Sequence, residues 1–337
     1  MVDTKQRKVR YGIIGFGAFA ERAIAPAIRA SRNSELVAIQ KRSAVAASKK
    51  AKEFDIPLAF DSAEELAGHQ DVDAVFIVSA NSQHCPETIA AAKEKKHVLV
   101  EKPMALSVAE ASRMVKACRD HGVRLMVGHM IRFSPLVRRM KEVIESGIIG
   151  HVTFAKTEFI YDGRMSQRAW LHDMKIAGGG PLFDIGVHCL DTLRFLLGGE
   201  ILSVKSHLEP APTKTRTEST AEVLLKFSNK ALASIYCSYA APIRRSLIEI
   251  IGTEGTLSAL DFTLGSRVIP LEIFTGAKGK SANTQRELIE VPNLYVEEIT
   301  HFSKCILEGA IPSIAGEVGL ENQRILDLAL KGEKFKA

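Results

Sequence analysis

The fold of the first part of the chain is decided by one stretch, Val9-Arg10-Tyr11-Gly12-Ile13-Ile14-Gly15-Phe16-Gly17-Ala18-Phe19-Ala20. Its first half is a short apolar run that ends at glycine, which is typical of a buried parallel strand. Its second half has the spacing Gly15-x-Gly17-x-x-Ala20 and opens a helical pattern. The first glycine permits a tight turn, the second lets backbone N–H groups approach a pyrophosphate, and the small third residue allows close packing of helix on strand. We therefore expect residues 15–20 to bind a dinucleotide, Phe16, Ala18 and Phe19 included.

Strand and helix patterns alternate through the first 128 residues. Further short apolar runs predict strands at 36–39, 74–78, 97–100 and 125–127. Ser62 and Ser107 precede helical patterns, and each has a glutamate three residues later, which is a helix-start signal. This alternation predicts a doubly wound parallel sheet with helices on both faces, an α/β Rossmann domain over residues 1–128.

The pattern changes after residue 128. Helices are predicted at 135–146, 186–197, 297–307 and 318–330, and β-rich runs at 151–160, 203–207, 221–227, 231–237 and 246–251. Successive strands joined by short turns indicate a mainly antiparallel sheet, and hence a second α/β domain over residues 129–337. The polar stretch 275–290 is expected to be a loop.

Composition excludes several classes of protein. The net charge of +6 is scattered over 45 basic and 39 acidic residues, so no nucleic-acid partner is expected. The five cysteines form no C-x-x-C pair, which argues against a disulfide framework and a metal site. No apolar run reaches the ~20 residues of a membrane helix, and the first ten residues contain no signal core. A cytoplasmic protein without a membrane partner is expected.

The end of the second strand bears on the choice of cofactor. An acidic residue there would bind the ribose 2′-hydroxyl of NAD, whereas basic residues suit the 2′-phosphate of NADP. The sequence reads Gln40-Lys41-Arg42-Ser43, with no acid. Arg42 can bind a phosphate with its planar fork and Ser43 can donate a hydrogen bond. NADP is therefore favoured, with NAD as the alternative. If these residues have no role in cofactor binding, they form a basic turn exposed to solvent.

Glu101-Lys102-Pro103 directly follows the fourth predicted strand, at the edge of the sheet where ligands bind. A lysine removed from water there could serve as hydrogen-bond partner or base for a substrate hydroxyl, and the following proline restricts the direction of Lys102. Taken alone, a lysine before proline is more often a surface residue.

A second cluster follows three glycines, Gly178 to Gly180, which allow close approach of backbone to a ligand. Asp184 and His188 are four residues apart and would share one face of a helix. Asp184 could orient substrate hydroxyls while His188 relays a proton. A helix cap and a core histidine explain the same residues equally well.

Taken together, the motifs resemble the Gfo/Idh/MocA family, named after glucose–fructose oxidoreductase and inositol dehydrogenase. The resemblance rests on the Gly15 turn, on Asn81-Ser82-Gln83-His84, on Glu101-Lys102-Pro103 and on Asp184-x-Gly186-x-His188, in this order, and it covers nearly the whole chain. One departure is Ser79-Ala80, where many members have threonine-proline.

The resemblance implies hydride transfer between a nicotinamide cofactor and a sugar, polyol or inositol-like substrate. It places Lys102, His188 and Asp184 among the catalytic residues. Arg164, Arg168, Trp170 and His172 could line the substrate pocket, although a loop on the surface explains these four residues equally well. Arg168 and Trp170 are substrate-binding candidates beside Lys102, Asp184 and His188. The cofactor-binding candidates beyond the Gly15 turn are Lys41, Arg42, Ser43, Ser79, Asn81, His84, Glu101 and Lys102.

The resemblance also implies a homodimer or homotetramer formed through the large sheet. Two alternatives remain open: a non-catalytic cofactor-binding sensor of the same fold, and an NAD-assisted glycoside-cleaving enzyme.

Overall fold

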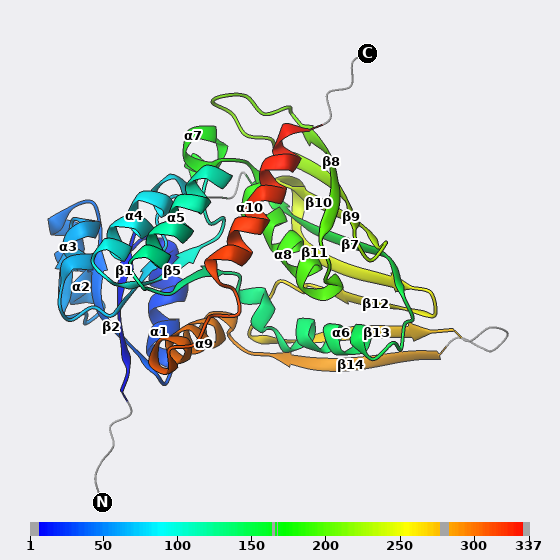
Figure 1. Ribbon diagram of the computed structural model, residues 1–337, viewed down its shortest axis with the longest axis horizontal. Helices are drawn as coiled ribbons and strands as arrows, with labels where there is room; N and C mark the ends of the chain where they lie inside the picture. The colour runs from blue at the N-terminus through cyan, green and yellow to red at the C-terminus, as the bar shows by residue number, and fades with distance from the viewer. Residues whose placement is uncertain (1–6, 164–165, 167, 277–282, 333–337) are drawn as a thin grey trace, which may run out of the picture. The chain divides into compact units, whose positions relative to one another are not determined.

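The computed structural model describes residues 7–163, 166, 168–276 and 283–332, which form two compact units (Figure 1). The first unit comprises the described part of Met1–His129 together with Tyr295–Gln323, and the second comprises the described parts of Met130–Leu294 and Arg324–Ala337. This division differs from a second domain that runs unbroken from residue 129, because residues 295–323 pack with the first unit.

The first unit is built on a parallel sheet, whose strand order among the described residues is β3-β2-β1-β4-β5-β6. The strands are β1 (Val9–Ile14), β2 (Ser34–Gln40), β3 (Leu58–Phe60), β4 (Ala74–Ile77), β5 (His97–Glu101) and β6 (Leu125–Gly128). Its helices are α1 (Ala25–Ala30), α2 (Ala44–Glu53), α3 (Ala63–Gly68), α4 (Asn81–Lys93), α5 (Val108–Asp120) and α9 (Leu294–Glu308), and a π-helical turn at Ala20–Ile24 precedes α1. The order reverses between β1 and β4, which creates the switch point where doubly wound sheets bind ligands.

Local sequence explains where these helices begin. The hydroxyl of Ser62 accepts a hydrogen bond from the backbone N–H of Glu65 at 3.2 Å, and that of Ser107 does so from Glu110 at 3.3 Å. Both starts were predicted from the serine–glutamate spacing. Strand β4, which lies between these two helix starts in the sequence, is buried at every residue, as expected for a central parallel strand.

The second unit contains a mostly antiparallel sheet, with the order β14-β13-β12-β11-β7-β10-β9-β8 among the described residues. The strands are β7 (Val152–Asp162), β8 (Ile201–Glu209), β9 (Thr220–Phe227), β10 (Leu232–Ser238), β11 (Ala240–Gly252), β12 (Gly255–Leu260), β13 (Arg267–Thr275) and β14 (Asn283–Val291). The helices are α6 (Pro135–Glu145), α7 (Met174–Ala177) and α8 (Val187–Leu197), with short helical turns at Met130–Phe133, Ala169–His172 and Leu182–Gly186, and α10 (Gly316–Lys331) is divided between the two units.

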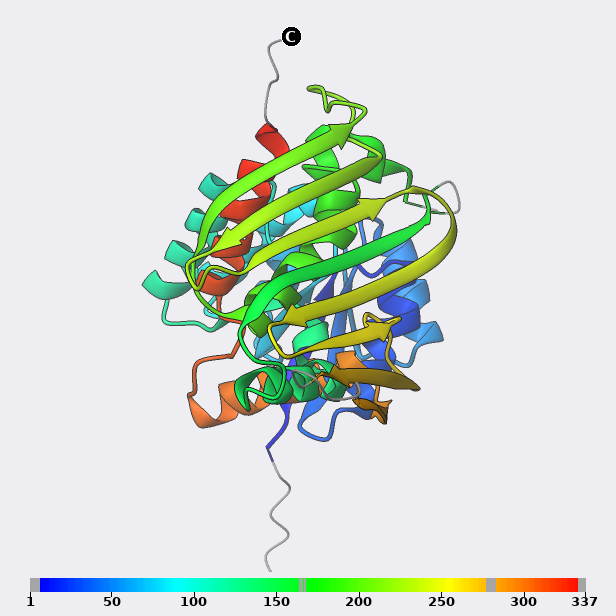
Figure 2. The same cartoon turned by 90° about the vertical axis from the view of Figure 1, so that its right-hand side faces the viewer.

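The core of the second unit lies on one face of this sheet. In β9, Ala221, Val223, Leu225 and Phe227 are buried, while the residues between them point away from the core. This alternation is the period-two pattern of a sheet that is covered on one face. Helices α6 and α8 lie behind the sheet in Figure 2, and no helix of the described residues covers its front face.

The expectation of a loop at 275–290 was wrong for its larger part. Strand β13 extends to Thr275, and β14 pairs with it antiparallel from Asn283↔Thr275 to Val291↔Arg267; residues 277–282 lie outside the described residues. Because β14 is an edge strand, much of it faces solvent and carries polar residues. Polar composition therefore concealed the strand.

Candidate functional site

The turn after β1 has the geometry that a dinucleotide requires. Gly15 has a φ of +84°, and a Cβ at this position would lie 2.7 Å from the backbone N and Cα of Ser79. A Cβ on Gly17 would meet only the Gly15 carbonyl oxygen, at 3.9 Å. The first glycine is thus required by the fold of the chain, whereas the second leaves open space above the start of the following helix. These residues fit a pyrophosphate held by backbone N–H groups.

Two of the side chains in this turn face the interior. Phe16 and Ala20 are each 1% exposed, and the Phe16 ring packs edge-on against Phe54 with 5.3 Å between centroids. Ala18 is exposed, and Phe19 contacts the ring of Tyr295. Phe16 and Ala20 therefore offer a cofactor only their backbone atoms, while their side chains fix the helix on the sheet.

Gln40, at the end of β2, holds the glycine turn in place. Its Oε1 accepts a hydrogen bond from Gly15 N at 3.1 Å, its Nε2 donates to Asp61 O at 3.0 Å, and its backbone O accepts from Phe16 N at 2.9 Å. Sequence reasoning looked for an acid at this strand end and did not assign Gln40 a role. A buried amide suits this position because it supplies both the acceptor for Gly15 N and the donor for Asp61 O.

The basic residues after Gln40 have different environments. The Lys41 ammonium donates to Phe16 O at 2.5 Å and lies 3.9 Å from Glu21, so it is engaged within the turn. The Ser43 hydroxyl caps α2 by accepting from Ala46 N at 3.4 Å. Arg42 is exposed next to this helix start. Of the two cations, Lys41 is engaged within the turn and Arg42 is exposed at the surface.

The segment after β4 packs against the glycine turn and against the segment after β5. His84 is buried; its Nδ1 lies 2.9 Å from Pro103 O and its Nε2 lies 3.2 Å from Ser79 O. The Ser79 hydroxyl donates to Glu87 Oε2 at 2.5 Å. Burial lowers the pKa of His84 to about 4, so its ring is neutral at physiological pH. Asn81, another candidate, is buried at the first position of α4.

Lys102 directly follows β5 at the carboxyl edge of the parallel sheet, as the sequence predicted. Its backbone N–H donates to Glu101 Oε2 at 3.2 Å, its side chain is half-buried, and the Lys102–Pro103 peptide bond is cis. Within the first unit, the structure thus brings the turns that carry Gly15, Ser79 and Lys102 to the same edge of the sheet.

In the second unit, Asp184 is the centre of a hydrogen-bonded cluster. Asp184 is 4% exposed, and its carboxylate Oδ2 accepts from the hydroxyls of Tyr161 at 3.1 Å and Tyr239 at 3.2 Å. The Arg168 guanidinium donates to Oδ1 at 3.3 Å and to Oδ2 at 3.0 Å. Four donors offset the cost of burying this charge.

The topology of the sheet explains why the two tyrosines meet. Strands β7 and β10 run parallel, with Ile160 opposite Ser238. Tyr161 and Tyr239 are the next residues of each chain segment, so both lie at the carboxyl ends of adjacent strands, with ring centroids 5.1 Å apart. Burial and the Asp184 charge raise the pKa of both phenols, so each hydroxyl keeps its proton and donates to the carboxylate.

The glycine-rich turn before Asp184 is fixed by a residue that sequence reasoning missed. The buried Glu218 carboxylate accepts from Gly180 N at 2.9 Å and Leu182 N at 3.1 Å. A Cβ on Gly180 would lie 2.0 Å from Glu218 O, so this close approach needs a glycine. Gly180 therefore serves a contact within the chain.

The remaining candidates lie around the same cluster. His188 is buried at the start of α8, with its ring 6.3 Å from that of Phe159. The Arg168 guanidinium lies 5.8 Å from the centre of the Trp170 ring, and the His172 ring packs edge-on against Tyr239. Arg164 lies outside the described residues.

The cysteines, the apolar helices and the possible metal ligands of the described residues complete the description of the two units. Cys85, Cys118, Cys189, Cys237 and Cys305 are buried free thiols in this structure. Within the described ranges, no helix has the length and apolarity needed to cross a membrane, and no group of three or more His, Cys, Asp and Glu residues could hold a metal ion.

Comparison with known proteins identifies the family. Residues 9–129 match the model of an oxidoreductase family with an NAD-binding Rossmann fold, and residues 137–258 match the GFO/IDH/MocA C-terminal domain. The chain is 31% identical to 1,5-anhydro-D-fructose reductase of Ensifer adhaerens, covering 92% of each chain, and 28% identical to the NADP(+) D-xylose 1-dehydrogenase of Haloarcula marismortui, covering 93% of this chain and 87% of that one. It superimposes on aldose-aldose oxidoreductase from Caulobacter crescentus with a TM-score of 0.85 at 26% identity, covering 96% and 97% of the two chains. The chain therefore belongs to the Gfo/Idh/MocA family of NAD(P)-dependent oxidoreductases.

Proposed function

We propose that this protein transfers a hydride between NADP(H) and a carbinol or carbonyl carbon of a sugar-like, polyhydroxylated substrate. The observation that carries the proposal is the position of Lys102, which follows β5 at the sheet edge that also holds the dinucleotide turn. A bound nicotinamide would supply the hydride chemistry. Lys102 would bind the reacting oxygen of the substrate and hold or release its proton.

Roles in the second unit follow from the contacts of each residue. Asp184 already accepts four hydrogen bonds from Tyr161, Tyr239 and Arg168, which suits an anchor better than a proton carrier. We therefore assign Asp184 to holding these groups toward substrate hydroxyls, and His188 to sharing the proton with Lys102. Arg168 and Trp170 would contact the substrate, because a guanidinium and an indole ring offer hydrogen bonds and an apolar face to a sugar.

The preference for NADP rests on Arg42. Its guanidinium is exposed beside the Ser43 cap of α2, where the 2′-phosphate of a dinucleotide bound at the Gly15 turn would lie. Fluorescence titration should show NADPH binding at least several-fold more tightly than NADH. Arg42→Ala should remove most of that difference while leaving NADH affinity within twofold. Equal affinity of the unaltered protein for the two cofactors would contradict the NADP assignment.

The relatives suggest which compounds to test. We expect oxidation of D-xylose or reduction of 1,5-anhydro-D-fructose, or of related aldoses and polyols, followed at the absorbance of the reduced cofactor. Lys102→Met should lower turnover by at least a hundredfold on the best of these substrates, with cofactor affinity retained. Turnover that survives within tenfold would show that Lys102 is not the reactive group.

We also propose that the open face of the second unit's sheet joins copies of the chain into a dimer or tetramer. Its strands expose apolar side chains, including Leu224, Leu260 and Leu288, on the face that no described helix covers. Light scattering should show an oligomer that Leu224→Glu together with Leu260→Glu dissociates. A monomeric unaltered protein would refute this surface.

A further inference from the structure

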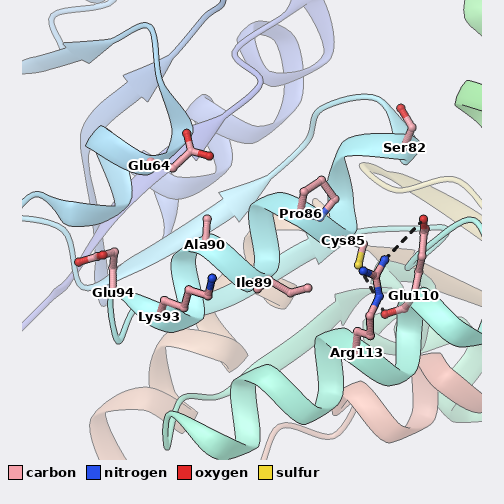
Figure 3. Close-up of a pocket in the computed structure, with 10 residues that line it drawn as sticks. All are labelled: Glu64, Ser82, Cys85, Pro86, Ile89, Ala90, Lys93, Glu94, Glu110 and Arg113. Carbon is pink, nitrogen blue, oxygen red and sulfur yellow. Dashed lines mark hydrogen bonds and ion pairs between the residues drawn. The ribbon is translucent and has the colours of Figure 1, made fainter.

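Helix α4 has two faces with different surroundings. Figure 3 shows one of them, a surface pocket between α3, α4 and α5. From α4, the pocket is lined by Ser82, Cys85, Pro86, Ile89, Ala90 and Lys93. His84 and Glu87 do not line this pocket; their side chains bond instead to the segments that follow β4 and β5. His84 and Glu87 therefore connect α4 to the segments that carry Ser79 and Pro103.

Glu87 is linked to the dinucleotide turn through Ser79. Its Oε2 accepts from the Ser79 hydroxyl at 2.5 Å, and the backbone of Ser79 is the wall against which Gly15 packs. Because a Cβ on Gly15 would lie only 2.7 Å from Ser79 N, the two backbones are close, and the position of Ser79 limits where the turn can lie. The side chain of Ser79 is thus held by Glu87, while its backbone N and Cα face Gly15.

His84 joins the segments after β4 and β5. Its Nε2 faces Ser79 O and its Nδ1 faces Pro103 O, the residue after Lys102. Burial holds the pKa of His84 at about 4, so the neutral ring donates from only one nitrogen. The contact between Nδ1 and Pro103 O is the shorter of the two, at 2.9 Å against 3.2 Å, and it is the hydrogen bond that a ring protonated at Nδ1 would donate.

We propose that His84 and Glu87 are positioning residues that form a brace on α4: Glu87 fixes the dinucleotide turn through Ser79, and His84 fixes the Lys102 turn through Pro103. This inference rests on the proposed function, in which the dinucleotide turn binds the cofactor and the Lys102 turn binds the substrate. It changes the expected role of His84 from a cofactor contact to a support of the reactive lysine. Ser79 keeps the hydroxyl that the threonine of many members would supply, and this hydroxyl donates to Glu87.

The two arms can be separated by substitution. In His84→Asn the side-chain amide replaces Nδ1 and can still donate to Pro103 O, whereas in His84→Gln it replaces Nε2 and reaches only toward Ser79. Glu87→Gln keeps an acceptor for the Ser79 hydroxyl, and Glu87→Ala removes it. Glu94→Gln, at the end of the same helix and lining the pocket, is the matched control.

The first readout is amide hydrogen exchange of the protein without cofactor, measured by mass spectrometry. We expect Glu87→Ala to speed exchange at least fivefold in residues 78–82, and His84→Gln to do so in residues 101–106. Glu87→Gln, His84→Asn and Glu94→Gln should stay within twofold of the unaltered protein. Equal rates in all variants, or faster exchange throughout the first unit, would overturn the brace.

The second readout is a split between binding and turnover, with NADPH and the best substrate of the aldose and polyol panel. Glu87→Ala should raise the Kd for NADPH at least fivefold with turnover at saturation within twofold. His84→Gln should lower turnover at least tenfold with the Kd within twofold, and His84→Asn should restore most of it. Parallel changes of both quantities overturn the brace alone, whereas an unaltered protein that binds neither NADPH nor NADH overturns the proposed function and the brace together.

Discussion

Gly17→Ala is expected to damage cofactor binding without damaging the fold. Gly17 lies outside the positive-φ region, and an added Cβ would meet only the Gly15 carbonyl oxygen at 3.9 Å. At a compatible backbone position, alanine stabilises a protein by roughly 0.4–1 kcal/mol relative to glycine, because the unfolded chain has less freedom to lose. The free energy of unfolding of the cofactor-free protein should therefore stay the same or rise slightly.

The cost should appear in binding. A methyl group above this turn keeps the pyrophosphate from the backbone N–H groups, and each hydrogen bond to a charged group is worth about 1.5–3 kcal/mol. The loss of one such bond corresponds to a roughly ten- to hundredfold weaker Kd. Fluorescence titration with NADPH measures the change, and urea unfolding without cofactor measures the stability.

Gly15→Ala is the matched comparison, because its added Cβ would lie 2.7 Å from the Ser79 backbone at a φ of +84°. Left-handed strain alone costs about 1–3 kcal/mol, and Ser79 must also move, so this variant should lose at least about 2 kcal/mol of stability. The steric reasoning is refuted if Gly15→Ala unfolds at the same urea concentration as the unaltered protein. If Gly17→Ala binds NADPH within twofold of the unaltered protein, the phosphates do not approach this backbone.

Two further substitutions test the electrostatics of the units. Asp184→Ala removes the acceptor shared by Tyr161, Tyr239 and Arg168, and should lower the free energy of unfolding by about 2–4 kcal/mol. This loss is smaller than that expected for breaking a fully buried ion pair, because Arg168 is partly exposed. A loss below about 0.5 kcal/mol in urea unfolding would contradict the described cluster. Glu87 tests pH dependence, because its pKa is raised from 4.5 to about 7. Burial is the main cause and the charge of Glu64 adds to it, while the hydrogen bond from Ser79 lowers the pKa in part. An acid whose pKa is raised in the folded state costs nothing below pH 4.5 and progressively destabilises the fold as pH rises through 7. Glu87→Gln should therefore match the unaltered protein at pH 4.5 and gain about 1–3 kcal/mol over it at pH 8, and a stability difference that does not change with pH would contradict the buried carboxyl.

The first unit was predictable to a large extent, because its signals are local. The strand at 9–14, the glycine turn and the serine helix starts each depend on residues within a few positions of one another, and the structure places them as expected. Strand β3 and the return of residues 295–323 to this unit were not predicted. A three-residue strand has no periodicity to detect, and the packing of a distant helix leaves no local pattern.

The site in the second unit shows where local reasoning ends. Asp184 and His188 were found because they lie in one motif, but their roles stayed undecided between catalysis and packing. Tyr161 and Tyr239 carried no signal, since 78 positions of sequence separate them and only the parallel register of β7 and β10 makes them neighbours. Glu218 was missed for the same reason: it supports the glycine turn from 38 residues away.

The sequence by itself determined the class of fold, the dinucleotide turn and the candidacy of Lys102, because tight turns and buried strands impose residue types at fixed short spacings. Tertiary structure decided what each candidate touches: that Gly15 is required by Ser79 while Gly17 faces open space, that His84 supports Pro103, and that Asp184 binds two tyrosines and an arginine. Hydrogen bonds form between groups that are close in space, and a chain that crosses a sheet repeatedly brings together residues that no sequence spacing relates.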